Sequence, residues 1–269
     1  MIGTPPPAES ERLDWDAAKY HRVAAPQEAW AREILDRLPL SGDETVLDAG
    51  CGSGRVTRLL LERLPHGRVV GVDASPAMVE LAQATLGGDE RVALSCQDLL
   101  ELHLGEPVDA VFSCAVFHHI GDHERLFARV RAALREGGRV VAQCGGEGNI
   151  ARFRADADSV AGRAPYAEHL ADFASPWHYP SPAETEARLA GAGFEAVRCW
   201  LEPKPTTPAD ARAFAETVLL NYHIKALRAS VPEGEADALA SAFVDDVLAV
   251  AGHPLELQYV RLNIEARAA

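Results

Sequence analysis

Apolar runs and amphipathic stretches alternate along the first half of this 269-residue chain. Five short apolar runs predict β-strands, at residues 45–48, 68–73, 91–95, 108–113 and 139–144. Between them, apolar residues at helical spacing predict helices at residues 56–64, 76–86 and 124–134. Because strands that alternate with helices pair in parallel, the pattern predicts a parallel sheet with helices on both faces.

Regular alternation lapses after residue 145. The expected elements there are helices at 149–162 and 181–190, a strand at 194–202, a largely helical stretch at 206–252 and a closing strand at 255–266. The whole chain therefore predicts an α/β fold, with a doubly wound, seven-stranded, mostly parallel sheet and helical caps.

The same pattern divides the chain into three parts. Residues 1–40 are expected to form an N-terminal helical arm or lid, in which Pro26 opens a helix. The expected cofactor-binding core comprises residues 41–145, 181–202 and 254–269. Residues 146–180 and 203–253 are expected to form a helical cap over the substrate pocket, because a long excursion inside a compact domain is usually functional.

A glycine-rich turn follows the first predicted strand, in the stretch T-V-L-D-A-G-C-G-S-G-R-V-T-R from Thr45 to Arg58. Strand, glycine turn and helix together allow backbone to approach a ligand closely, beside the unpaired N–H groups of a helix N-terminus. The dinucleotide fingerprint G-x-G-x-x-G needs a further glycine for close packing of helix on strand, and this turn is followed by Arg55 instead. The spacing therefore argues against NAD.

A carboxylate ends the second predicted strand. Asp73 lies about 20 residues beyond the glycine turn, the separation at which a doubly wound fold supplies a carboxylate to a ribose. A carboxylate can accept hydrogen bonds from both ribose hydroxyls. The alternative is a solvated acid at the start of the helix that follows Ser75.

The motif Asp48-Ala-Gly50-Cys51-Gly52-Ser-Gly54 resembles the first motif of class I S-adenosylmethionine-dependent methyltransferases. More narrowly, the chain resembles the trans-aconitate methyltransferase-like branch, in Trp15-Asp16 with Tyr20, in the V-D-A-S-P-A-M turn and in helical caps on both sides of the sixth strand. The resemblance implies a Rossmann-like sheet whose last strand runs antiparallel beside the fifth. It also implies S-adenosyl-L-methionine as cofactor and a small-molecule methyl acceptor.

The resemblance further implies a set of cofactor-binding residues. Asp98 would accept from the adenine amine, with a plain turn residue as the alternative, and Tyr20 would fold over the cofactor unless it merely packs its helix on the sheet. The full set is Tyr20, Asp48, Gly50, Cys51, Gly52, Gly54, Asp73, Ala74, Met78, Gln97, Asp98, Leu99, Cys114, Ala115 and His119.

Candidate bases follow the fourth strand, in Cys114-Ala-Val-Phe-His-His. A carboxylate acceptor needs no base at pH 7, whereas a hydroxyl or amine would benefit from a neutral histidine. His119 is the preferred catalytic candidate and His118 the second, and because adjacent histidines are expected to face different ways, at most one should face the reaction centre. Packed histidines are the alternative, and the residues nearby do not predict a metal site.

The acceptor pocket is expected between the carboxyl edge of the sheet and the caps. Small-molecule pockets are mostly apolar with a few polar groups. The candidate substrate-binding residues are His21, Trp177, Tyr179, Tyr222 and His223, unless these aromatic residues form the core of the cap. Arg152, Arg154 or Lys225 could pair with an acidic acceptor.

The composition limits the kinds of binding partner and compartment that we expect for this protein. The formal net charge is −14 and no cluster of lysine and arginine is present in the sequence, which argues against a nucleic acid as acceptor. The N-terminus lacks the pattern of a signal peptide, and no run of about 18 apolar residues predicts a membrane span. The five cysteines form no C-x-x-C pair and indicate reduced thiols. A cytoplasmic monomer or homodimer without membrane contact is expected.

The favoured interpretation is an enzyme, a methyltransferase that uses S-adenosylmethionine and methylates a carboxylate or hydroxyl oxygen of a metabolite. C- or N-methylation of a natural product stays open. Two other classes are considered, an NAD(P)-binding oxidoreductase and a non-catalytic interaction protein. Arg55 counts against the first, and the intact set of Gly50, Gly52, Gly54, Asp73 and Asp98 against the second.

Overall fold

Seven strands form one mixed sheet in the computed structural model, which describes residues 25–269, with side chains from Trp30 onward. The strands are β1 Thr45–Ala49, β2 Arg68–Asp73, β3 Val92–Cys96, β4 Val108–Cys114, β5 Leu134–Gly145, β6 Phe194–Thr206 and β7 Leu257–Ala268. Their order is β3-β2-β1-β4-β5-β7-β6. Strands β1 to β5 pair in parallel, and β7 runs antiparallel to both of its neighbours. The predicted fold class is confirmed, including the direction of the last strand.

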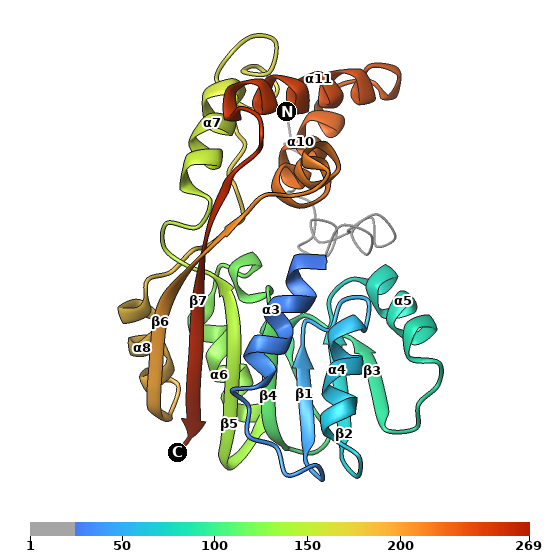
Figure 1. The fold of residues 1–269 in the computed structure, drawn as a ribbon, viewed down its shortest axis with the longest axis vertical. Helices are drawn as coiled ribbons and strands as arrows, with labels where there is room; N and C mark the ends of the chain where they lie inside the picture. The colour runs from blue at the N-terminus through green and yellow to red at the C-terminus, as the bar shows by residue number, and fades with distance from the viewer. Residues whose placement is uncertain (1–24) are drawn as a thin grey trace, which may run out of the picture.

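Helices cover both faces of this sheet (Figure 1). Helices α3 Ala25–Leu35, α4 Arg55–Arg63 and α5 Pro76–Leu86 contribute to one apolar cluster, and α6 His123–Ala133 and α8 Pro182–Gly191 to another. Val46 belongs to the first cluster and Leu47 to the second, because successive side chains of a strand point to opposite faces. Both are fully buried, which explains why the central strands appear as continuous apolar runs in the sequence.

Two strands are longer than their sequence pattern predicts. β5 begins at Leu134 instead of residue 139, because the expected turn at 135–138 is taken up as an irregularity in its pairing with β4. β6 continues to Thr206 through Pro203 and Pro205. Proline is tolerated there because β6 is an edge strand, paired with β7 alone, so that alternate N–H groups face away from the ladder.

The extra length of β6 joins the sheet to the cap. Beyond the point where Gly145 pairs with Arg261, β6 and β7 continue together as a two-stranded ribbon. The ribbon leads from β6 into α9 Ala211–Phe214, the π-helical turn η3 Ala215–Leu219, α10 Asn221–Ser230 and α11 Glu233–Ala251, whereas α7 Ala151–Ala161 follows β5. These elements share an apolar cluster of their own, to which Trp30 of α3 also belongs. Figure 1 shows the cap above the carboxyl ends of β1, β4 and β5.

Among the described residues, no helix combines the length and the apolar character that crossing a lipid bilayer requires.

Candidate active site

Three glycines with positive φ shape the turn between β1 and α4. The φ angles of Gly50, Gly52 and Gly54 are 83°, 51° and 77°. The N–H groups of Gly50 and Cys51 both donate to the carbonyl of Val72, at 2.8 and 3.0 Å, and so fasten the turn to the end of β2. A Cβ at Gly50 would lie 2.2 Å from Cγ2 of Val116, so the turn and the segment after β4 meet at a contact that only glycine allows.

Asp73 reaches this turn from the end of β2. Its Oδ2 accepts the N–H of Gly52 at 2.9 Å, and its Oδ1 accepts the N–H of Ser75 at 2.9 Å. Burial raises the pKa of Asp73, and these two hydrogen bonds oppose the shift. Each carboxylate oxygen retains acceptor capacity beyond these bonds. The structure therefore brings Asp73 and the glycine turn together, as the spacing predicts.

Two other residues of the motif lie beneath the turn. The Asp48 carboxylate is buried and accepts the hydroxyl of Thr57 at 2.7 Å, and burial raises its pKa to about 7. The Cys51 side chain is buried against Gly71, and burial raises the pKa of its thiol. Asp48 therefore holds the turn to α4, and Cys51 packs it against β2.

The segment after β3 is a single 3₁₀ turn, η1 Leu99–Glu101. Oδ1 of Asp98 accepts the N–H of Leu100 at 2.8 Å, so Asp98 does serve as a capping residue, the alternative that its sequence context left open. The Gln97 side chain is held by Ser95 and by the N–H of His103. Leu99 is buried.

The two adjacent histidines lie in a second 3₁₀ turn, η2 Phe117–His119. Their ring centroids are 4.2 Å apart and both rings line the same cavity, so the expectation that at most one faces the candidate centre was wrong. Neighbouring side chains lie about 180° apart in a strand but about 120° apart in a 3₁₀ turn, and both can therefore reach one wall. The turn follows Ala115, whose φ of 62° is uncommon for a residue with a side chain.

The cavity encloses about 30 Å³ between the carboxyl edge of the sheet and the cap. Its lining residues are Trp30, Ala115, His118, His119, Asn149, Ile150, Trp177, Tyr179, Val218, Leu219, Tyr259 and Arg261. The lining thus includes the predicted Trp177 and Tyr179. Tyr222 reaches it indirectly, since its hydroxyl lies 3.0 Å from Nδ1 of His119.

Both histidines are neutral near pH 7. Burial, and then the charge of Arg261, lower the pKa of His119 to about 4, and burial lowers that of His118 well below its ordinary value. Nδ1 of His118 accepts the N–H of Gly145 at 3.3 Å, so the neutral ring carries its proton on Nε2. An imidazole whose conjugate acid has a pKa of about 4 is a weak base.

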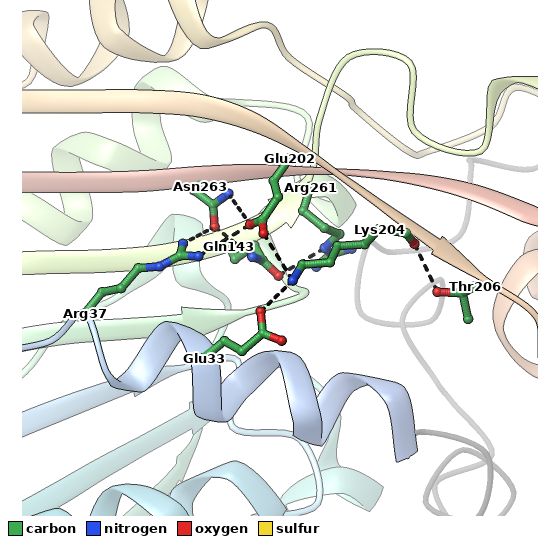
Figure 2. A network of polar contacts seen from close by, with 8 residues as sticks. All are labelled: Glu33, Arg37, Gln143, Glu202, Lys204, Thr206, Arg261 and Asn263. Carbon is green, nitrogen blue, oxygen red and sulfur yellow. Dashed lines mark hydrogen bonds and ion pairs between the residues drawn. The ribbon is translucent and has the colours of Figure 1, made fainter.

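The cation at this cavity is Arg261 of β7, a residue that the sequence pattern did not single out. Its Nε donates to Oε1 of Gln143 at 3.2 Å (Figure 2). Its guanidinium carbon lies 4.9 Å from the ring centre of Trp30. Arg154, one of the cations proposed from the sequence, lies over the ring of Tyr179 at 5.2 Å and does not line the cavity. The sequence did contain a signal for Arg261, because this arginine interrupts an apolar strand. The alternation of apolar and polar residues along the strand, however, would place such a residue on a face exposed to solvent.

Comparisons with known proteins agree with this geometry. A model of the methyltransferase domain family matches residues 46–138. The trans-aconitate 2-methyltransferase of Methylobacterium nodulans is 35% identical over 181 residues, 67% of this chain and 69% of that enzyme. An uncharacterised methyltransferase of Schizosaccharomyces pombe is 30% identical over 216 residues, 78% of this chain and 82% of that protein. The chain belongs to the class I S-adenosylmethionine-dependent methyltransferases. Its relatives place it in the trans-aconitate methyltransferase-like branch.

Solved structures support the fold of this methyltransferase. A mycolic acid cyclopropane synthase in complex with SAH matches it with a TM-score of 0.60 over 99% of both chains, at 16% identity. At that identity the likeness concerns the fold alone. The predicted enzyme class and cofactor are confirmed by the family, and the comparisons do not favour the NAD(P) oxidoreductase.

Three of the predicted residues are not found at the cavity, for two different reasons. Tyr20 and His21 are outside the described residues. His223 lies in the cap, with its ring 4.3 Å from that of Phe173 and 5.5 Å from that of Phe243, and it does not line the cavity. Within residues 25–269, no three histidine, cysteine or acidic side chains are grouped so as to hold a metal ion.

Alanine substitutions in the glycine turn should distinguish backbone strain at positive φ from a steric clash with Val116. Both Gly50→Ala and Gly52→Ala force a positive φ on alanine, at about 1–2 kcal/mol each. Gly50→Ala adds the clash with Val116, whereas a Cβ at Gly52 has no atom within 4 Å. We expect Gly50→Ala to lower the free energy of unfolding by about 1–3 kcal/mol more than Gly52→Ala, measured by urea denaturation without cofactor. Equal losses would contradict the close contact.

The buried histidines should make this methyltransferase sensitive to acid. Burial lowers the pKa of His223 to about 4, below the value near 6.5 expected for the unfolded chain, so the unfolded state binds the proton first as the pH falls. Stability is fully present above pH 6.5 and is lost towards pH 4, at about 1.4 kcal/mol per pH unit for one such group.

Replacing this histidine tests that dependence. His223→Phe should reduce the loss of unfolding free energy between pH 6.5 and 5 by about 2 kcal/mol, measured by urea denaturation at both pH values. His66→Gln, at an exposed histidine, is the control. If His223→Phe and the wild type lose the same free energy, the buried neutral state of His223 is refuted.

Proposed function

We propose that this methyltransferase transfers the methyl group of S-adenosylmethionine to an oxygen of a small organic acid, with a carboxylate as the acceptor. The observation that carries the proposal is the pairing of two neutral, weakly basic histidines with a buried arginine in one cavity. Ala115 lines this cavity, and the next residue, Val116, contacts Gly50 of the glycine turn. A carboxylate is already ionised at pH 7 and needs no base, whereas a hydroxyl acceptor would call for a base with a pKa near 7.

The described residues suit the cofactor. The positive-φ turn from Gly50 to Gly54 would pass under its methionine part, and Asp73 would accept from the ribose hydroxyls. Asp98 and the Leu99 N–H would contact the adenine. Ala74, Met78, Gln97, Cys114 and Ala115 would complete the surroundings. The N–H of Ala115 is already bonded to the Gln143 carbonyl at 2.7 Å, so Ala115 would contribute contact and not a donor.

Bound cofactor supplies a methyl group on a sulfonium, so that a C–O bond forms as the C–S bond breaks and the electron pair stays on sulfur. The chain then has to align the acceptor and exclude water. A volume of about 30 Å³ holds one or two water molecules, so we expect the cap to shift when an organic acid binds.

The relatives support an acidic acceptor. The Methylobacterium nodulans relative is a trans-aconitate 2-methyltransferase, and the match covers 69% of its length. Trans-aconitate is therefore the first compound to test. A hydroxyl acceptor is the second candidate, because the Tyr222 hydroxyl beside His119 offers a polar pair at the cavity wall.

Calorimetry tests the cofactor assignment. The wild type should bind S-adenosylmethionine and its demethylated product, and should not bind NAD. Asp73→Asn should weaken binding of S-adenosylmethionine by about 1–3 kcal/mol, because a charge-assisted acceptor is lost. Asp36→Asn removes an exposed carboxylate that pairs with Arg63 and is the control. Unchanged affinity in folded Asp73→Asn would rule out the ribose assignment, and NAD binding alone would rule out the proposed function.

The pH dependence of the rate separates the two acceptor classes. With trans-aconitate at saturating cofactor, kcat/KM should stay flat from pH 6.5 to 9, because the acceptor is ionised and His119, with a pKa of about 4, does not titrate there. A tenfold rise per pH unit over this range would show that a hydroxyl or a base must lose a proton, and would favour the second candidate.

A further inference from the structure

Arg261 is a buried cation without an acidic partner among the described residues. Its side chain is 2% exposed, and it lies where β7 passes the carboxyl end of β5, opposite Gly145. Within residues 25–269, one terminal nitrogen of its guanidinium is buried and has no hydrogen-bond partner. Buried charges are ordinarily paired, because an unpaired one costs several kcal/mol. The site is therefore built for a group that is not part of the described chain.

A hydrogen-bond network fixes how Arg261 is presented (Figure 2). Nε2 of Gln143 donates to Oδ1 of Asn263 at 2.7 Å, and Nδ2 of Asn263 donates to Oε2 of Glu202 at 3.1 Å. Because these bonds use the amide nitrogen of Gln143, its Oε1 has to face Arg261, whose Nε donates to it. Gln143 is thus a positioning residue for the guanidinium.

The charges within this network balance without Arg261. Glu202 pairs with Arg37 at 3.4 Å and with Lys204 at 3.1 Å, and Lys204 also pairs with Glu33 at 2.6 Å. The carboxylates of Glu33 and Glu202 are therefore matched by the cations of Arg37 and Lys204. Neither carboxylate is left to neutralise Arg261. Burial, and then the positive charge of Arg261, lower the pKa of His119, which lines the same cavity.

A second buried donor without a partner in the described chain belongs to Trp177, which also lines this cavity. Nε1 of Trp177 is buried and has no hydrogen-bond partner within the part of the chain that the structure describes. Trp177 and Arg261 come from the cap and from the sheet, and both line the cavity beside His118 and His119. Indole N–H and guanidinium are donors without acceptor capacity, so the ligand that satisfies both is rich in acceptor oxygens and negatively charged.

We infer that Arg261, presented by Gln143, binds a carboxylate of the methyl acceptor and determines its specificity, with Trp177 donating to the same molecule. This inference rests on the proposed function and assigns the residues that select the acceptor. The planar fork of arginine suits a carboxylate, and in a closed, water-poor site the ion pair discriminates strongly against neutral analogues.

Binding of trans-aconitate to the protein saturated with S-adenosylhomocysteine tests the inference without turnover. Arg261→Met keeps the length and removes the charge, and should weaken trans-aconitate binding at least 30-fold in calorimetry while the affinity for S-adenosylhomocysteine stays within twofold. In turnover, KM for trans-aconitate should rise by a similar factor. Gln143→Leu should give a smaller loss, since it removes the orientation and leaves the charge.

The matched control is Arg198→Met. Arg198 stacks on a tryptophan ring, as Arg261 does, with its guanidinium 4.4 Å from the ring of Trp200, but it is exposed on β6. Its loss should leave trans-aconitate affinity unchanged. If Arg261→Met fails to fold, Arg261→Lys can be used instead, because it keeps the positive charge but lacks the planar guanidinium that binds a carboxylate through two hydrogen bonds. It should bind trans-aconitate at least tenfold more weakly than the wild type.

The outcomes separate this inference from the proposed function. Folded Arg261→Met that binds trans-aconitate as the wild type does would overturn the role of Arg261. The role of Arg261 would also be overturned by a wild type that methylates only neutral alcohols, amines or the fully esterified acid. The protein would still be a methyltransferase, but its acceptor would not be a carboxylate. A wild type that binds no S-adenosylmethionine would refute the proposed function. Weakened acid binding with intact cofactor binding would support both.

Discussion

The position of β7 between β5 and β6 is the constraint on which the rest of the site depends. An antiparallel strand enters the sheet from the side of the cap, so one strand serves both the core and the cap. Because β7 has neighbours on both sides, and because side chains from α3 and the turn after it reach one of its faces, a polar residue on that face is removed from water and needs another partner. Arg261 and Asn263 are such residues, and they are 2% and 1% exposed.

The polar contacts over this face connect parts of the chain that are distant in sequence. Glu33 comes from α3 and Arg37 from the turn after it, Gln143 comes from β5, and Glu202 and Lys204 come from the edge strand. A network of this kind adds specificity of arrangement more dependably than it adds stability, since the desolvation of its members offsets much of the attraction between them. As a consequence, the guanidinium of Arg261, at the end of this network, has a defined direction.

Charge at the cavity acts on the histidines as well as on a ligand. Burial and a nearby cation both disfavour protonation of His119, so the arginine suited to an anionic acceptor also keeps the neighbouring imidazole neutral. The cavity therefore combines attraction for an anion with weak basicity. That combination suits transfer of a methyl group to a nucleophile that arrives already ionised, and it assigns to the protein the tasks of alignment and exclusion of water.

The alternation of strands and helices, the glycine turn and the carboxylate of Asp73 were determined by the sequence alone. Each depends on local rules, namely the period of apolar residues, the need for positive φ at Gly50, Gly52 and Gly54, and the distance along a strand–helix–strand unit. Tertiary structure decided the rest of the site. The alternation of polar and apolar residues in β7 does not show whether the polar face is exposed to water or buried by other parts of the protein. A pair of adjacent histidines likewise does not show that a 3₁₀ turn brings both rings to one cavity. Burial and direction depend on which segments meet in space, and for Arg261 that meant α3, β5 and the cap together.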